Sequence, residues 1–104
     1  MNSLKNKIAS LIQFAYAARK LCFGESAIVK MMVNKVDILV LASDIAQNQD
    51  KKYRQKAAYY QVPTVTVFSK SELGELFSKN EVACVGVMDH NIASQIKKLS
   101  EDNQ

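Results

Sequence analysis

The chain has 104 residues, of which 48% are hydrophobic and 23% charged, and this predicts a single domain over residues 1–104 whose core needs no metal or disulfide. The low count of three glycines and one proline argues against low-complexity disorder. The absence of a long apolar run argues against a signal peptide or a membrane span. We therefore expect a cytoplasmic protein with no membrane partner. The net charge is +4, and residues 1–35 carry six basic residues against one acid, a net of +5 that suits RNA, DNA or an anionic membrane surface but serves solubility equally well.

The first half of the chain alternates helical and strand patterns. Apolar residues at helical spacing predict an amphipathic helix over 3–18, which docks on a sheet or, as the weaker alternative, lies on a membrane. Residues 20–23 predict a short strand, and residues 25–34 predict a second helix. The continuously apolar segment 37–42 predicts a strand covered on both faces. The buried face of the second helix is predicted to comprise Ala27, Ile28, Met31 and Met32.

The second half continues the alternation. Asn48 is the predicted N-cap of a helix over 49–60, and the β-branched segment 64–68 predicts a strand. Ser69 and Glu72 have the spacing of a capping box, which predicts a helix ending near Phe77. A further strand is predicted over 82–88, and Asp89 is the predicted cap of a last helix that buries Ile92, Ile96 and Leu99.

Strictly alternating helices and strands predict an α/β fold in which a mostly parallel sheet lies between two helical layers. In such sheets, functional sites gather in the loops beyond the ends of the strands.

Few residues in this sequence are suited to catalysis. His90 is the only histidine, Cys22 and Cys84 lie far apart among apolar neighbours, and these three lack the spacing of zinc ligands. We therefore expect buried thiols, no metal and no cofactor. Asp44 follows an apolar strand, where it is either catalytic or, more commonly, hydrogen-bonded to the next turn. The sequence favours a protein that is not an enzyme and has no small-molecule substrate.

Several segments, taken in their order and spacing, carry a family resemblance. They are FAYAARKLCFGE (14–25), GESAIVK (24–30), ILVLASD (38–44), YYQVPTVTVFSKSELGELF (59–77) and VACVGVMD (82–89). Together they resemble the small ribosomal-protein superfamily that binds kink-turn RNA, and within it the bacterial YlxQ-type RNA-binding branch. The likeness extends from about Phe14 to Leu99.

The resemblance implies a three-layer α/β/α sandwich with a four-stranded mixed sheet. It also implies a non-catalytic protein that binds structured ribosomal or translation-associated RNA. In this family the RNA contacts the N-terminus of the glycine-led helix and the loop before the last strand.

The start of the glycine-led helix has physical properties that suit RNA. The first turn of a helix leaves amide N–H groups unpaired, and Gly24 has no side chain to keep a phosphate away. Ser26 and Lys30 are four residues apart, so we expect both on one exposed rim, where Ser26 contacts a base or 2′-hydroxyl and Lys30 neutralises a phosphate. The alternatives are simple helix capping by Gly24 and Glu25 and a solvated lysine.

The sequence departs from the family pattern at two places. Kink-turn binders have Asn-Glu where this chain has Ser26 and Ala27, and Ala27 cannot accept the guanine hydrogen bond that the family glutamate accepts. The loop before the last strand is apolar in those binders but polar here, which favours a phosphate contact by Lys79 over packing on an extruded base.

The sequence thus predicts an RNA site with cationic and polar members. Arg19 and Lys20 are secondary candidates beside it, and a solvated loop is an equally good interpretation of the segment around residue 80. The predicted members are Gly24, Glu25, Ser26, Lys30, Lys35, Lys79, Asn80 and Glu81. The alternative function is a protein-interaction adaptor, which the missing Asn-Glu pair and the lack of an exposed aromatic platform would favour.

Overall fold

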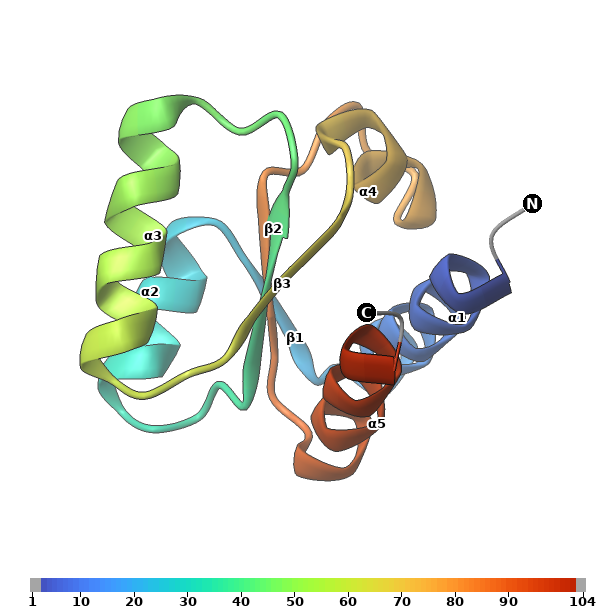
Figure 1. The fold of residues 1–104 in the computed structure, drawn as a ribbon, viewed down its shortest axis with the longest axis horizontal. Coiled ribbons are helices and arrows are strands. Elements are labelled where there is room, and N and C mark those ends of the chain that lie inside the picture. The colour runs from blue at the N-terminus through green and yellow to red at the C-terminus, as the bar shows by residue number, and fades with distance from the viewer. Residues whose placement is uncertain (1–2, 103–104) are drawn as a thin grey trace.

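The computed structural model describes residues 3–102, which form a three-layer α/β/α sandwich (Figure 1). Five helices and four strands alternate along these residues, as the sequence predicts. The helices are α1 (Ser3–Ala17), α2 (Glu25–Met32), α3 (Gln47–Tyr59), α4 (Lys70–Leu76) and α5 (His90–Asp102). The strands are β1 (Leu21–Phe23), β2 (Ile38–Ala42), β3 (Thr64–Phe68) and β4 (Cys84–Val87).

The sheet is mixed, so the prediction of a mostly parallel sheet from the alternation is wrong, whereas the mixed sheet implied by the family resemblance is confirmed. The strand order is β1-β4-β2-β3, and β4 runs antiparallel to both β1 and β2 while β2 and β3 are parallel. The chain between β3 and β4 stays at one end of the sheet (Figure 1), so β4 returns in the opposite direction. A parallel β4 would need a crossover back to the other end.

The two faces of the sheet bury separate apolar clusters. Side chains of β2 alternate between them, with Ile38 and Val40 facing the α1, α4 and α5 side and Leu39 and Leu41 facing the α2 and α3 side. All four are fully buried, and burying such a side chain stabilises the fold by about 1.5–3 kcal/mol. This two-sided burial is the reason why β2 is continuously apolar.

Two local predictions about helices are wrong. Asn48 is not the N-cap of α3, because the helix begins at Gln47 and Ala46 (φ −57°, ψ 140°) is the N-cap. The Ala46 side chain has no group that could accept a capping hydrogen bond. Met32 is 56% exposed although its neighbour Met31 is fully buried. The reason is that Met32 lies one residue further around the helix, beside the exposed Val29 and Val33 and outside the buried face of Ala27, Ile28 and Met31.

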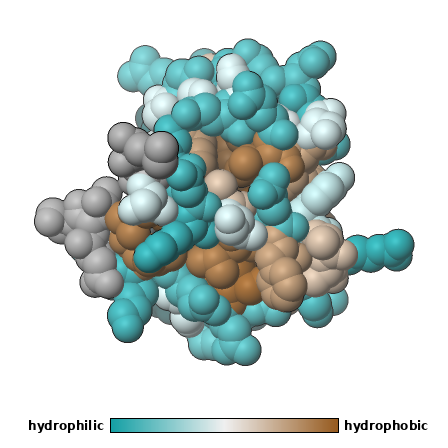
Figure 2. Space-filling view, turned by 90° about the vertical axis from the view of Figure 1, so that its right-hand side faces the viewer, coloured by the Kyte–Doolittle hydropathy of each residue, from teal (hydrophilic) through white to brown (hydrophobic). Residues whose placement is uncertain are grey.

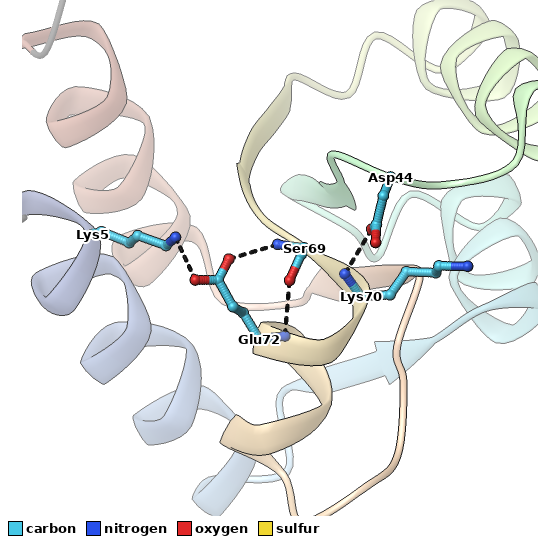
Figure 3. Close-up of polar contacts among 5 residues, drawn as sticks. All are labelled: Lys5, Asp44, Ser69, Lys70 and Glu72. Carbon is cyan, nitrogen blue, oxygen red and sulfur yellow. Dashed lines mark hydrogen bonds and ion pairs between the residues drawn. The ribbon is translucent and has the colours of Figure 1, made fainter.

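The start of α4 is held by a hydrogen-bonded cluster, drawn in Figure 3. The Ser69 hydroxyl accepts from the Glu72 amide (3.1 Å), and the Glu72 carboxylate accepts from the Ser69 amide (2.8 Å), so the predicted capping box is confirmed. The same carboxylate pairs with Lys5 of α1 at 2.6 Å, and Asp44 accepts from the Lys70 amide at 2.8 Å. Asp44 therefore links the loop after β2 to the start of α4 by a hydrogen bond. This agrees with the interpretation that Asp44 is hydrogen-bonded to the next turn rather than catalytic.

Gly74 lets the loop before β4 pack directly on α4. A Cβ atom at this position would lie 2.7 Å from the carbonyl oxygens of Lys79 and Asn80, both of which are backbone atoms. The Lys79 amide also donates to the Gly74 carbonyl at 2.9 Å. The glycine thus fixes where residues 78–81 lie relative to the end of the sheet.

Gly74→Ala is expected to destabilise the protein by roughly 1 kcal/mol or more, because the clash with two backbone carbonyls outweighs the better helix propensity of alanine. Urea denaturation measures the free energy of unfolding. Ser71→Ala, at an exposed position of the same helix, is the control and should change stability by less than about 0.5 kcal/mol. A Gly74→Ala protein as stable as this control would contradict the tight packing.

Glu72→Gln should lower the thermal midpoint at neutral pH while keeping the capping geometry. The Lys5 ammonium and the Ser69 amide hold the pKa of Glu72 below its ordinary value of 4.5. Stability from the ionised form is therefore present above pH 4.5 and is lost as pH falls through the lower folded-state pKa. Thermal midpoints followed by circular dichroism should converge for the two proteins in acid, and a constant difference would show that the charge is irrelevant.

Candidate nucleic-acid interface

Gly24 lies at one end of the sheet. The carboxyl ends of β1, β2 and β3 and the start of β4 meet at this end. The Gly24 backbone (φ 56°, ψ −128°) is in a region open essentially to glycine alone. The Gly24 amide donates to the Cys84 carbonyl at 3.0 Å, so it is not free for a ligand. Among the described residues, no acceptor takes the amides of Glu25 and Ser26, which leaves these two donors at the α2 N-terminus.

The Glu25 carboxylate is occupied by α3. It accepts from the Lys52 ammonium at 2.9 and 3.0 Å and from the Tyr53 hydroxyl at 3.5 Å. Burial of the Tyr53 ring, together with the nearby Cys84 and Glu25, raises the pKa of Tyr53 to about 12. Glu25 therefore joins α2 to α3, a role that neither sequence-based interpretation of this residue included.

The loop before β4 lies beside Gly24, as the family resemblance implies. Phe23, Gly24, Lys79 and Glu81 line one depression together with residues 82–84, and we call this surface the Gly24 edge. Glu81 lies 4.0 Å from the Lys70 ammonium, while Asn80 is exposed. The two carboxylates here, those of Glu25 and Glu81, are each paired with a lysine. The Lys79 ammonium therefore gives the Gly24 edge an excess of positive charge.

Four cations lie close together at the opposite end of the sheet, where β1 and β2 begin. This surface, which we call the basic depression, also includes Asn34, Asp37 and Met88, and its cations are Arg19, Lys20, Lys30 and Lys35. Among the described residues, no carboxylate lies within 4.0 Å of any of the four ammonium or guanidinium groups. Four positive charges against the single carboxylate of Asp37 make this surface strongly basic.

Two helices end at the basic depression in the same way. Arg19 (φ 61°) follows α1 and Asn34 (φ 60°) follows α2, both in the left-handed conformation. The Lys20 amide donates to the Ala15 carbonyl and the Lys35 amide to the Lys30 carbonyl, which are the bonds of Schellman motifs. Two helix C-termini with their partial negative charge therefore point here. Their partial charges stabilise the nearby cationic side chains.

The predicted site residues thus lie at both ends of α2, and Ser26 and Lys30, four residues apart, are about 6 Å apart along the helix axis. Ser26 is exposed on the first turn of α2, near the Gly24 edge, whereas Lys30 and Lys35 line the basic depression. The two surfaces are separated by the length of α2, about 12 Å for eight residues at 1.5 Å each. Ala27, Ile28 and Met31 pack inward between them, as predicted.

Aromatic residues near this region were not anticipated from the sequence. Tyr16 is 43% exposed and Tyr59 is 78% exposed, which weakens the sequence-based argument from the lack of an exposed aromatic platform. Tyr16 packs against Phe23 and Phe77 with ring centroids 5.8 and 4.8 Å away. The helical pattern of residues 3–18 places Tyr16 off the buried stripe, and this was the signal that could have identified it.

The two cysteines are placed as the sequence predicts. Cys22 and Cys84 are buried free thiols, and burial raises the pKa of Cys84 to about 12. His90 is exposed, with Nδ1 3.9 Å from a carboxylate oxygen of Asp37. Within residues 3–102, no cluster of histidine, cysteine and acidic side chains is suited to hold a metal ion. The same part of the chain holds no helix with the length and hydropathy needed to cross a membrane.

The other face of the sheet carries a different kind of surface. In Figure 2, which looks onto α1, α4 and α5, apolar residues gather in the middle and hydrophilic residues surround them. A groove between α1 and α5 is lined by Leu11 and Leu99 and flanked by Lys7 and Lys98. This groove lies across the sheet from α2 and contributes nothing to the surfaces described above.

The fold and its charged surface define a class, the small α/β/α proteins with a mixed sheet and a cation-rich surface at one end of it. Residues 6–97 match the Ribosomal protein L7Ae/L30e/S12e/Gadd45 family, and the chain belongs to this family. The chain is 33% identical to the RNA-binding protein YlxQ of Enterococcus faecium over 93% of this chain and 94% of that protein. It is 32% identical to the protein of the same name from Bacillus subtilis, over 86% and 90% of the two chains.

Solved structures have the same fold. A protein of unknown function from Bacillus halodurans superposes with a TM-score of 0.86 at 29% identity, covering 91% of this chain and 97% of that one. The 15.5kD RNA binding protein of Giardia lamblia superposes with a TM-score of 0.80, covering 98% of this chain and 91% of that one. Its 17% identity supports the fold alone.

Arg19→Gly is expected to stabilise the protein by up to about 1 kcal/mol, because glycine adopts positive φ without the steric cost that a side chain adds. Gln61→Gly, at the equivalent position after α3 (φ 60°), should behave alike. The control is Ala58→Gly inside α3, which should cost about 0.5–1 kcal/mol. Urea denaturation separates these outcomes, and an Arg19→Gly protein destabilised like Ala58→Gly would contradict the assigned strain.

Proposed function

We propose that this protein binds structured RNA, ribosomal or translation-associated, without catalysing a reaction on it. The observation that carries the proposal is the basic depression, where four cations without carboxylate partners line one concave surface. Two relatives that match nearly the whole chain are named RNA-binding proteins. Phosphate contacts supply most of the affinity of such proteins and require unpaired cations of this kind.

The two ends of α2 have different roles in this proposal. At the basic depression, Lys30 and its neighbours neutralise phosphates. At the Gly24 edge, the free amides of Glu25 and Ser26 and the Ser26 hydroxyl donate to phosphate or 2′-hydroxyl oxygens, and Lys79 adds a charge. The distance of about 12 Å between the ends lets one RNA segment contact both.

Polar base recognition takes a different form from that of kink-turn binders. Ala27 is fully buried and has no acceptor, and the Glu25 carboxylate is engaged by Lys52 and Tyr53. Base-edge contacts at the α2 N-terminus therefore fall to Ser26, so we propose that shape and phosphate positions count for more than one base identity.

Lys30→Ala should weaken RNA binding and flatten the plot of log affinity against log salt concentration by just under about one unit, because one phosphate contact is lost. Fluorescence titration with total cellular RNA at several salt concentrations measures both. The thermal midpoint should change little. Lys98→Ala removes the same charge from α5, across the sheet, and should leave the slope unchanged.

An RNA affinity unaltered by Lys30→Ala would remove this residue from the site. Wild-type binding that is absent, or that vanishes at physiological salt, would overturn the RNA proposal and favour a protein-interaction adaptor.

A further inference from the structure

Three aromatic rings cluster beside the edge strand β1, and we call them the aromatic ledge: Tyr16 of α1, Phe23 of β1 and Phe77, which follows α4. Phe23 meets the other two rings edge to face, with centroids 5.8 Å from Tyr16 and 5.2 Å from Phe77. Phe77 is buried and belongs to the core, whereas Tyr16 is 43% exposed and Phe23 is partly exposed. Two of the three rings therefore present aromatic surface to solvent above a rigid base.

A lysine ammonium accompanies this surface. Nζ of Lys79 lies 5.2 Å from the centroid of the Phe23 ring. Within residues 3–102 no carboxylate pairs with Lys79, in contrast to Lys5, Lys52 and Lys70. An aromatic ring beside an unpaired cation suits a ligand that combines a flat π-system with a negative charge, which describes a nucleotide.

The ledge lies between the two basic surfaces. β1 is only three residues long, and it connects Lys20 of the basic depression to Phe23 and Gly24 of the Gly24 edge. Because β1 is the outer strand of the sheet, no further strand covers this side. A nucleic-acid strand that contacts both surfaces along this edge passes over Tyr16 and Phe23.

We propose that the aromatic ledge binds an unpaired nucleobase of the RNA by stacking on Tyr16 and Phe23, with Lys79 neutralising a neighbouring phosphate. This inference rests on the proposed RNA-binding function. The loop at residues 78–81 is polar, and the ledge beside it at Phe23 supplies an apolar surface for an extruded base. Stacking on aromatic side chains tolerates any base, so the ledge selects unpaired nucleotides rather than a sequence.

The test compares two RNA hairpins that differ only in a bulge of unpaired adenosines, one of which is replaced by a fluorescent adenine analogue whose emission is quenched on stacking. Wild-type protein should bind the bulged hairpin more tightly than the fully paired one and quench the analogue. Tyr16→Leu and Phe23→Leu should each reduce this preference by roughly 5- to 100-fold, or abolish it, with little effect on the fully paired hairpin.

Matched variants separate stacking from packing. Tyr16→Phe keeps the ring and should retain the preference, and Tyr59→Leu removes a more exposed tyrosine from α3 and should leave it intact. Tyr16→Leu carries the test should Phe23→Leu unfold, since Tyr16 is the more exposed ring.

The outcomes distinguish the two proposals. Wild-type protein that binds neither hairpin would overturn RNA binding and the ledge together. Equal affinity for both hairpins, or a preference and quenching that survive Tyr16→Leu, would overturn the ledge while leaving RNA binding by the basic depression in place.

Discussion

Strand β4 lies between β1 and β2 and runs against both, and this placement determines which loops meet. Because β4 starts where β1 ends, the Gly24 amide reaches the Cys84 carbonyl at 3.0 Å, and the loop before β4 lies beside the start of α2. The capping box at Ser69 and the close approach at Gly74 then fix α4 and that loop. A parallel β4 would have put these segments at opposite ends of the sheet.

The cations of the basic depression stabilise two helix ends and also make this surface positive. Two Schellman motifs end α1 and α2 there, and cations beside helix C-termini are favourable in their own right. Partial charges of about half a unit at each terminus offset only part of four full charges, so the surface stays positive. Arg19 and Asn34 also occupy positive φ, as does Gln61 after α3, because this is the left-handed position of a Schellman motif.

The candidate site could be predicted from the sequence only in part. The residues at the start of α2 and in the loop before β4 were identified from the family resemblance, and these two segments are indeed adjacent. Their partners were not predictable, because Lys52 and Lys70, which engage Glu25 and Glu81, are 27 and 11 residues away in the chain. The grouping of Lys30 with Arg19, Lys20 and Lys35 depends on β1 and β2 beginning at the same end of the sheet.

The sequence by itself determined the elements, because apolar periodicity and capping motifs are local properties of the chain. The apolar run of β2 and the Ser69-to-Glu72 box each indicate their structure within a few residues. Only the tertiary structure decided the direction of β4, the pairing of Glu25 with α3 and the packing of Tyr16 against Phe23 and Phe77. Each of these depends on contacts between segments distant in the chain, and no local pattern of residues encodes which distant segment will lie alongside.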